Sequence, residues 1–491
     1  MTLPEQRCDP DAPAAKEEVP FPHARPFSLQ GGTSQPLVAS VLRRSGARRS
    51  TGESWDVYWA DGTSPDDAYR KLDGTRKVAG FKGLGWLCSK SGLATALERA
   101  RTLAGRRITH DLFDFAPRSF VFPADFHAWR VRAADEPEAI WISKVGDGAR
   151  GEGVNVVTDV EAVRPTPNLV LQEYVAAPHL LDGHKYTLRV YVAITSLDPL
   201  RVWVFPDGLT KLTTRPYTLD RASLGDRFVH LTNPTVLRQD QGADLASKRM
   251  THERYRERLR RDGHDDARLF RAIHAMVAKA ALAAREPMLT AQSAARLPVE
   301  GAFSLVGLDV LVDERMRPWL LEVNMGPSLA VESAATTDSA RAEEELKTRV
   351  VADLLGVLGL CPDAPVLYEP VFPSIAMFDW LPAYEEIRPS DVADLREVCA
   401  RQAFDPRVDV DAVTIEHDAP EELVVIHERH AHRIELNATA ALIWRSFAKG
   451  ASASETVRAV ELQDGPESAA DDVWETLARF VQIGAWTVRR S

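Results

Sequence analysis

One alternating stretch, residues 304–324 (SLVGLDVLVDERMRPWLLEVN), constrains the fold more than any other part of the chain. Its two apolar runs flank a polar centre, which is typical of a β-hairpin. If the turn spans residues 314–317, Asp309 lies directly opposite Glu322, and Asn324 shares the face of Glu322. Opposed carboxylates repel each other unless a cation separates them. The hairpin therefore predicts a site for a hard cation such as Mg²⁺, although a solvent-exposed edge hairpin is the alternative.

A glycine-rich segment lies upstream, in the sequence WISKVGDGARGEGV. Lys144 ends a predicted strand, and Gly148, Gly151 and Gly153 surround Arg150. Glycines let backbone amides approach phosphate oxygens closely, while the lysine and the arginine supply positive charge. The spacing matches neither a P-loop nor a dinucleotide-binding fingerprint. The segment indicates a phosphate-binding loop of another type, or else a simple turn.

Basic residues recur on one face of the next predicted strand, LDGHKYTLRVYV. Alternation places Lys185, Thr187 and Arg189 on one face and Tyr186 on the other. Buried like charges at this spacing need an anionic partner. The strand therefore predicts an anion-binding surface, unless it is an exposed basic face.

Charge and composition exclude several classes of protein. The chain has 60 Lys and Arg against 71 Asp and Glu, a formal net charge of −11, whereas nucleic-acid binding favours a basic surface. The N-terminus lacks the apolar core of a signal peptide, and no apolar run approaches the ~18 residues of a membrane helix. The four cysteines form no CxxC pair, which disfavours a zinc ribbon or a disulfide framework. We therefore expect a cytoplasmic protein with no nucleic-acid and no membrane partner.

The 491 residues suggest about three domains. Residues 1–36 hold seven prolines without sustained periodicity, so we expect a disordered tail. Residues 37–118 begin with two strand-like runs, VASVLRR and WDVYWAD, followed by the helical run SGLATALERARTLAG, and are expected to form an N-terminal α/β domain. Residues 119–360 carry the features above, with long strands over 186–205 and helices over 246–284 and 339–358. A proline-punctuated linker with a short helix (361–410) leads to a small domain (411–491).

The phosphate loop, the basic strand and the carboxylate hairpin occur in an order that resembles the tubulin-tyrosine-ligase-like family, which has an ATP-grasp fold. The resemblance extends from Trp55 to Leu360 and rests on RKVAGFKG, LCSK, FDFAPRSFVFPAD, KVGDGARGEG, LQEYV, LLDGHKYTLRVYV, DGLTKLTTRPY, FVHLTN, GLDVLV and WLLEVNMGPSL. It implies an α/β (α+β) ligase that uses ATP and Mg²⁺. In such a ligase, ATP phosphorylates a carboxylate, and an amine attacks the acyl phosphate to form an amide.

The resemblance also implies roles for individual residues. Lys90, Lys144 and Arg150, with the loop residues Gly148 and Gly151, would contact phosphates; Gln172, Tyr174 and Val175 would hold adenine; Lys185 would reach the nucleotide; Asp309, Glu322 and Asn324 would bind magnesium; and Arg189, Lys211 and Asn233 would stabilise the acyl phosphate or position the substrates. Fixed cations of this kind stabilise the charge that develops during phosphoryl transfer.

The sequence departs from the family pattern at three positions. Val145 follows the strand lysine where the family has proline, Thr187 replaces an acid in KYTLR, and Arg215 reverses a charge in TRPY. The predicted metal ligands are unchanged, so activity is expected. The departures concern the acceptor side, and tubulin is therefore not assumed to be the substrate.

The last 80 residues are similar to the PqqD-like peptide-binding domain, a small winged-helix-like fold. The similarity consists of three strand-like runs, then ELNATAALIW, a helix from about Ser454 and the run DDVWETLARFVQIGAW. Residues 411–491 contain 14 acids and eight bases, which disfavours the alternative of a DNA-binding winged helix. The resemblance implies that an extended leader peptide adds as a strand to a sheet edge.

Together these features predict an ATP-dependent carboxylate-amine ligase that joins an amino acid or amine to a peptide or protein, most simply a precursor peptide bound by the C-terminal domain. Two alternatives remain. One is a non-catalytic protein that binds nucleotide and peptide, as a chaperone or scaffold would. The other is a ligase that acts on a small metabolite or a folded protein.

Overall fold

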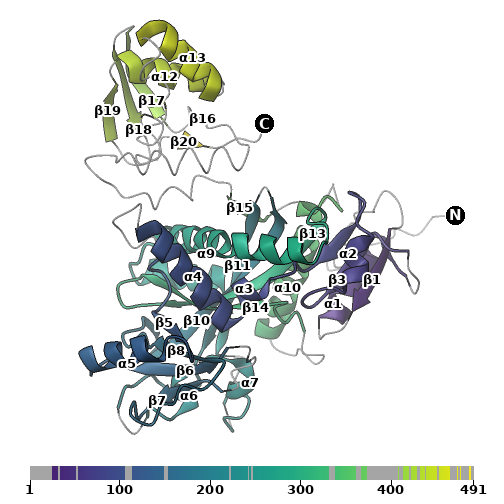
Figure 1. The fold of residues 1–491 in the computed structure, drawn as a ribbon, viewed down its shortest axis with the longest axis vertical. Coiled ribbons are helices and arrows are strands. Elements are labelled where there is room, and N and C mark those ends of the chain that lie inside the picture. Colours follow the sequence, from purple (N-terminus) through teal and green to yellow (C-terminus); the bar gives the residue numbers. More distant parts are fainter. Residues whose placement is uncertain are drawn as a thin grey trace, which may run out of the picture.

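An eleven-stranded sheet forms the centre of the protein (Figure 1). The structure is a computed structural model that describes residues 25–30, 34–50, 54–105, 113–146, 148, 153–198, 200–220, 223–241, 243–244, 247–330, 338–360, 367–372, 407–408, 413–419, 422–427, 432–436, 438–449, 453–464, 473, 476 and 486–487. The strands of this sheet are β1 (Pro26–Gln30), β2 (Arg48–Arg49), β3 (Val57–Ala60), β4 (Lys77–Ala79), β9 (Leu180–Leu181), β10 (His184–Leu197), β11 (Leu200–Leu212), β12 (Arg249–Thr251), β13 (Ala302–Val312), β14 (Pro318–Met325) and β15 (Glu369–Phe372).

The sheet has the strand order β12-β11-β10-β13-β4-β3-β1-β2, with β14 paired to β13, β15 to β11 and β9 to β10. Strands β1 to β4 are parallel to their neighbours, and β4 is also parallel to the start of β13. The other pairs, including β10 with β11 and with β13, are antiparallel. The two long strands predicted over residues 186–205 are therefore confirmed as β10 and β11, which pair with each other in the antiparallel part of the sheet.

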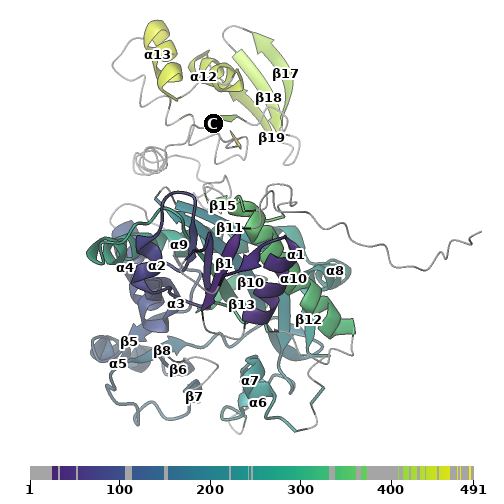
Figure 2. The same cartoon turned by 90° about the vertical axis from the view of Figure 1, so that its right-hand side faces the viewer.

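Helices cover both faces of this sheet (Figures 1 and 2). On one face lie α1 (Gln35–Arg44) and α10 (Asp338–Val357); on the other lie α3 (Gly85–Cys88), α4 (Lys90–Gly105), α8 (His252–Arg261) and α9 (Asp266–Ala294), while α2 (Asp66–Arg70) follows β3. Val38 and Leu354 belong to the core beneath α1 and α10, and Leu97 and Ile273 belong to the core beneath α4 and α9. The apolar stripe of each helix thus determines which face of the sheet it covers.

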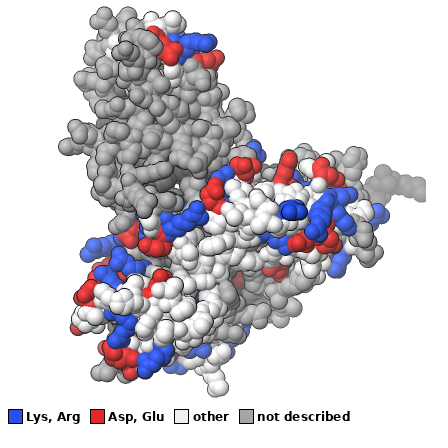
Figure 3. Space-filling view, viewed as in Figure 1, with Lys and Arg blue, Asp and Glu red and all other residues white. Residues whose placement is uncertain are grey.

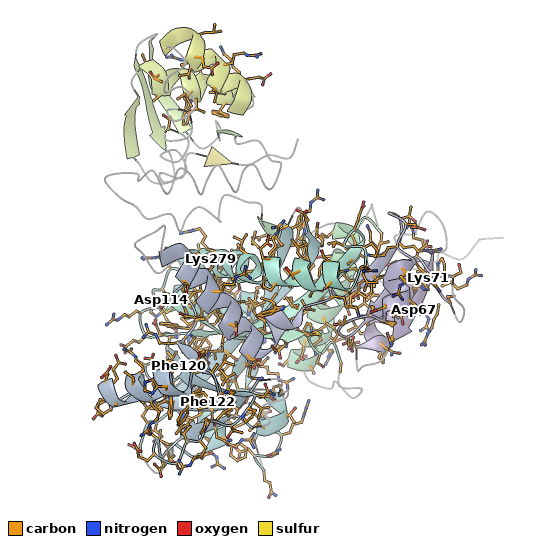
Figure 4. All side chains as sticks on the ribbon, in the orientation of Figure 1. Asp67, Lys71, Asp114, Phe120, Phe122 and Lys279 are labelled. Carbon is orange, nitrogen blue, oxygen red and sulfur yellow. The ribbon has the colours of Figure 1, made fainter. Side chains whose placement is uncertain are left out.

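A second sheet of four antiparallel strands forms a smaller lobe. Its strands are β5 (Ser119–Val121), β6 (Trp141–Val145), β7 (Asn155–Val157) and β8 (Leu169–Glu173), in the order β5-β8-β6-β7, and α5 (Phe126–Asp135) packs against β5. Phe120, labelled in Figure 4, lies on β5, and Phe122, also labelled, directly follows that strand. Phe122, Trp129 and Trp141 are buried together, with ring centroids 5.5 and 6.1 Å apart. These aromatic rings form the centre of the core of the smaller lobe.

The beginning of the chain differs from the expectation. Residues 1–24 lie outside the described residues, but β1 and the start of α1 fall within the 1–36 segment that we expected to be a disordered tail. The run VASVLRR, expected as a strand, forms most of α1. Pro36 lies in the first turn, and the buried residues Leu37, Val38, Val41 and Leu42 recur with helical spacing. This spacing outweighed the β-propensity of the valines.

Helix boundaries moved by several residues elsewhere. The helix expected from residue 246 begins at His252, because residues 249–251 pair with β11 and the Thr251 side chain caps α8. The second helix, α9, starts where the Asp265 side chain accepts a hydrogen bond from the Arg268 amide at 2.9 Å. It continues to Ala294, ten residues beyond the expected end, because the alanine-rich sequence favours a helix through Pro287. The helix expected at 339–358 is confirmed as α10.

The C-terminal region contains a three-stranded antiparallel sheet and two helices (Figure 2). They are β17 (Val413–Ala419), β18 (Glu422–His427), β19 (His432–Leu436), α12 (Ala438–Ala448) and α13 (Ala453–Asp464), with β16 (Arg407–Val408) paired to β20 (Trp486–Thr487). The three strands and the first two helices match the order expected from the sequence. Most of the linker, with the short helix expected there, and most of the third expected helix lie outside the described residues.

In the described part of the chain, no helix is long and apolar enough to cross a membrane. Figure 3 shows basic and acidic side chains interspersed on the face in view. Ion pairs among the described residues include Arg130 with Glu161 at 2.9 Å and Arg132 with Glu136 at 2.7 Å. Exposed pairs of this kind contribute little to stability.

Candidate nucleotide and metal site

A pocket of about 810 Å³, open solvent included, lies between the two sheets. Its lining comes from β6 and β8 of the smaller lobe, from β10, β11, β13 and β14 of the large sheet, and from a segment that contains the short helices α6 (Arg227–His230) and α7 (Pro234–Leu237). Nine of the predicted residues line it: Lys144, Gln172, Tyr174, Val175, Lys185, Lys211, Asn233, Asp309 and Glu322. Residues far apart in the sequence thus converge on one cavity, which is how binding sites are usually built.

The carboxylate hairpin forms as predicted, with one local difference. Asp309 pairs with Glu322, and Gly307 pairs with Asn324. The pairing shifts by one residue beyond Asp309, where Val310 pairs with Leu320, so Leu321 forms a β-bulge. If the pairing found next to the turn, from Val312 with Pro318 to Val310 with Leu320, continued without a bulge, Asp309 would pair with Leu321. Glu322 would then point to the opposite face of the sheet. The bulge therefore places Glu322 beside Asp309.

Asp309 is surrounded by cations. Arg189 donates two hydrogen bonds to its carboxylate, at 2.8 and 2.9 Å, and Lys211 Nζ lies 3.3 Å from Oδ1. Burial alone would raise the pKa of Asp309, but Arg189 and Lys211 outweigh burial and hold this pKa well below its usual range. Burial and the neighbouring Arg189 lower the pKa of Lys211 to about 8. Asp309 is therefore ionised at neutral pH.

Asn324 completes the predicted metal set. Its Nδ2 lies 3.2 Å from Asp309 Oδ2 and 3.5 Å from Glu322 Oε1. Among the described residues, no group of three or more His, Cys, Asp or Glu side chains could hold a metal ion. The predicted donor set consists instead of two carboxylates and one amide. These hard donors fit Mg²⁺, which is commonly bound through one or two carboxylates together with substrate phosphates. A side-chain amide turned by half a rotation presents its oxygen to the same position.

Two lysines occupy the predicted phosphate side. Lys90 Nζ donates to the Gly148 carbonyl at 2.5 Å and lies 3.7 Å from Glu322. Lys144 Nζ donates to Gln172 Oε1 at 2.5 Å. Burial lowers the pKa of Lys144 to about 8. Carbonyl oxygens now hold these ammonium groups, and phosphate oxygens could replace them as charged acceptors. Arg150 and Gly151 lie outside the described residues.

The predicted adenine side carries an aromatic network. Lys185 Nζ donates to the Tyr174 hydroxyl at 2.8 Å and lies 4.1 Å from the Tyr174 ring centroid. The same hydroxyl lies 2.9 Å from His230 Nδ1. Burial, followed by the charge of Lys144, lowers the pKa of Lys185 to about 7. An added phosphate would favour the charged form of this lysine.

His230 lines the pocket, as do Leu231 and Thr232, and none of the three was predicted from the sequence. The block FVHLTN was recognised, but only Asn233 was selected from it. In the structure, Asn233 accepts a hydrogen bond from the Thr235 amide at 2.9 Å and so caps α7, while the Thr232 hydroxyl lies 2.7 Å from the Thr187 hydroxyl. In the sequence, a histidine three residues before a helix-capping asparagine, as in His230 and Asn233, could have indicated that this segment lines the site.

Four described candidates lie just outside the pocket lining. Arg189 and Asn324 act through their contacts with Asp309. Lys90 lines a neighbouring cavity that shares Lys144, Gln172 and Leu321 with the main pocket. The fourth, Gly148, contacts Lys90 through its carbonyl. The structure therefore brings every described candidate to the same region.

Comparison with known proteins identifies a family. Residues 70–364 match the tubulin-tyrosine ligase family. Tubulin polyglutamylase ttll6 of Danio rerio is 30% identical over 66% of this chain and 41% of its own length. Tubulin polyglutamylase TTLL6 of Mus musculus is 29% identical over 68% and 40%, and tubulin monoglutamylase TTLL4 of Homo sapiens is 28% identical over 70% and 28%, respectively. The chain thus spans less than half the length of these relatives.

Proposed function

Since the chain belongs to the tubulin-tyrosine ligase family, as the sequence predicted, we propose that it is an ATP-dependent ligase that joins an amino acid to a peptide or protein acceptor. The observation that carries the proposal is the pair Asp309 and Glu322, opposed on β13 and β14 and flanked by four buried or half-buried cations. The relatives are named as glutamylases, so glutamate is the amino acid that we propose.

The proposed reaction has two steps. The γ-phosphoryl group of ATP moves to a carboxylate oxygen, which gives an acyl phosphate and ADP. The amine then attacks the acyl carbon, forms the C–N bond, loses a proton and expels inorganic phosphate. Lys90, Lys144 and Lys185 would hold the ATP phosphates, and Arg189 and Lys211 would stabilise the acyl phosphate, because fixed cations in a dry site stabilise developing charge.

The metal would be held by Asp309, Glu322 and Asn324, and it would neutralise phosphate charge during transfer. Asp309 already accepts hydrogen bonds from Arg189, but each carboxylate oxygen has more than one lone pair. Arg189 therefore fixes the orientation of Asp309 while leaving donor capacity for the metal.

Binding of Mg-ATP is the first test. Excess nucleotide should raise the melting temperature by mass action, with ~2.7 kcal/mol of stabilisation at one hundred times the dissociation constant. The measurement is a thermal melt with ATP and magnesium at millimolar concentrations, and the control is the same melt with ATP and a chelator. No shift in the first melt would contradict nucleotide binding.

We further propose that residues 411–491 bind the acceptor peptide. The matched family region ends at residue 364, so the proposal rests on the resemblance to PqqD-like domains. It is supported by the order of β17, β18, β19, α12 and α13, and by two strands, β17 and β19, that each pair with β18 alone among the described residues. An exposed strand edge can accept an extended peptide.

A two-by-two experiment tests this role. Deleting residues 411–491 should raise the Michaelis constant for a full precursor ~100-fold, because tethering gives effectively millimolar local concentration. A precursor without its leader should react as poorly with the intact protein as the full precursor does with the truncated one. Rates that depend on neither deletion would contradict recognition, and loss of ATP binding on truncation would indicate a structural role instead.

A further inference from the structure

One arginine, Arg215, contacts both ends of a segment that lies beside the pocket. Between β11 and β12, the chain leaves the large sheet at Leu212 and returns at Arg249, and its described residues contain only the two four-residue helices α6 and α7. We call residues 226–240 the α6–α7 segment. It supplies His230, Leu231, Thr232 and Asn233 to the pocket. A segment with so little regular structure depends on side-chain contacts for its position.

Arg215 provides such contacts at both ends of the α6–α7 segment. Its guanidinium donates to Asp226 Oδ2 at 2.7 Å and to Asp240 Oδ1 at 2.9 Å. The Thr214 hydroxyl donates to the other oxygen of Asp240 at 2.6 Å. Asp226 and Asp240 thus begin and end the segment, and a single side chain holds both.

The backbone around Arg215 adds further contacts. Its amide donates to the Phe228 carbonyl at 3.2 Å, and its guanidinium carbon lies 4.7 Å from the Phe228 ring centroid. The second oxygen of Asp226 accepts from the Phe228 amide at 2.9 Å and so caps α6. Arg215 is therefore tied to the first turn of the helix that carries His230.

From α6 the contacts continue into the pocket. His230 at the end of α6 contacts the Tyr174 hydroxyl, which accepts from Lys185. Thr232 contacts Thr187 on β10. A shift of the segment would change these contacts together, whereas Arg215 itself does not line the pocket.

We propose that Arg215 is a positioning residue, which fixes the α6–α7 segment against the nucleotide site by bridging Asp226 and Asp240. This inference rests on the proposed function, since it concerns how that site is held. Arg215 is also one of the positions where the sequence departs from the family pattern, by reversing a charge. Asp226 and Asp240 are the acidic partners of the positive charge that Arg215 introduces.

Arg258 offers a matched control. It also bridges two aspartates, Asp182 at 2.9 Å and Asp262 at 2.7 Å, and its side chain is 35% exposed against 47% for Arg215. None of these three control residues lines the pocket. If removal of any bridging arginine weakened Mg-ATP binding, Arg215→Gln and Arg258→Gln should therefore weaken it equally.

The test compares Arg215→Gln, Arg215→Lys and Arg258→Gln in the full chain. Arg215→Gln should raise the dissociation constant of Mg-ATP about three- to tenfold, and Arg215→Lys, which keeps one pair, should give a smaller rise. Arg258→Gln should leave the constant unchanged. Asp240→Asn combined with Arg215→Gln should be no worse than Arg215→Gln alone, because both remove the same interaction.

Hydrogen exchange gives a second readout without nucleotide. Amides of residues 226–238 should exchange faster in Arg215→Gln than in the wild type or Arg258→Gln. An unchanged dissociation constant in Arg215→Gln, an equal rise in Arg258→Gln, or unchanged exchange would overturn the proposal. Failure of the wild type to bind Mg-ATP would refute the proposed function, and the exchange comparison would still decide whether Arg215 holds the segment.

Discussion

Replacing Glu322 by glutamine is expected to lower the turnover rate at least 100-fold while leaving the fold intact. Glutamine has nearly the same volume but removes one negative charge from the metal set. Loss of a charged metal ligand in phosphoryl transfer should cost several kcal/mol of transition-state stabilisation, and each ~1.4 kcal/mol corresponds to a tenfold change in rate. The fold should tolerate the change, because the Glu322 side chain is 27% exposed and its nearest cation, Lys90, lies at 3.7 Å.

The same hairpin provides the control for this variant. Glu314 is exposed in the turn between β13 and β14, and its backbone amide donates to the Ala177 carbonyl. Glu314→Gln should therefore keep the wild-type rate. The measurement is ADP release at saturating Mg-ATP with urea melts of both variants. A Glu322→Gln rate above about a tenth of wild type would show that the metal ligand is misassigned.

The hairpin also shows how far sequence reasoning extends. Alternation and the opposed acids predicted the pair Asp309 and Glu322, and the pair is confirmed. The turn position was wrong by one residue, and the bulge at Leu321 compensates for it. The hydrophobic pattern does not reveal this bulge, because the extra residue, Leu321, is apolar like its neighbour Leu320. The predicted pairing was therefore correct, although the geometry that produces it was not foreseen.

Other parts of the site could not be predicted for a different reason. His230 and Thr232 reach the pocket from a segment with no sustained periodicity, and their positions depend on contacts across the fold, such as Thr232 with Thr187. The N-terminal helix α1 was missed because its valines favour a strand locally, whereas packing against α10 and β1 favours a helix. Local propensity is outweighed where tertiary burial is large.

The electrostatics of the pocket support nucleotide binding. Lys90, Lys144, Arg189 and Lys211 surround the two carboxylates Asp309 and Glu322, and Lys185 lines the same pocket. Burial lowers the pKa of three of these lysines, because cations excluded from water without enough anions are unfavourable. A triphosphate would supply the missing negative charge. Binding of a nucleotide, as proposed, would therefore relieve unfavourable positive charge in the pocket.

Replacing Asp309 by asparagine should affect stability as well as turnover. The Asp309, Arg189 and Lys211 side chains are only 14%, 12% and 9% exposed. Removing the carboxylate leaves two buried cations without their main partner, and breaking a buried pair in this way typically costs about 3–5 kcal/mol. The free energy of unfolding, measured without metal or nucleotide, should fall by about that amount.

The pH dependence follows from the direction of the pKa shift. The folded-state pKa of Asp309 lies below its ordinary value, so the stabilisation is fully present above that ordinary value and is lost only as the pH falls through the folded-state value. At neutral pH the wild type and Asp309→Asn should therefore differ by the full amount. The difference should shrink in strong acid, where the wild-type carboxylate also becomes protonated.

A double-variant comparison separates this explanation from a general disturbance of the hairpin. Lys211→Met removes one of the cations that Asp309 neutralises, so Asp309→Asn should cost less in the Lys211→Met background than in the wild type. Glu322→Gln, which abolishes the same metal set but breaks no close buried pair, should leave the urea midpoint nearly unchanged. Equal destabilisation by Asp309→Asn and Glu322→Gln, or equal costs of Asp309→Asn in both backgrounds, would contradict the assignment of Asp309 as the counter-charge of Arg189 and Lys211.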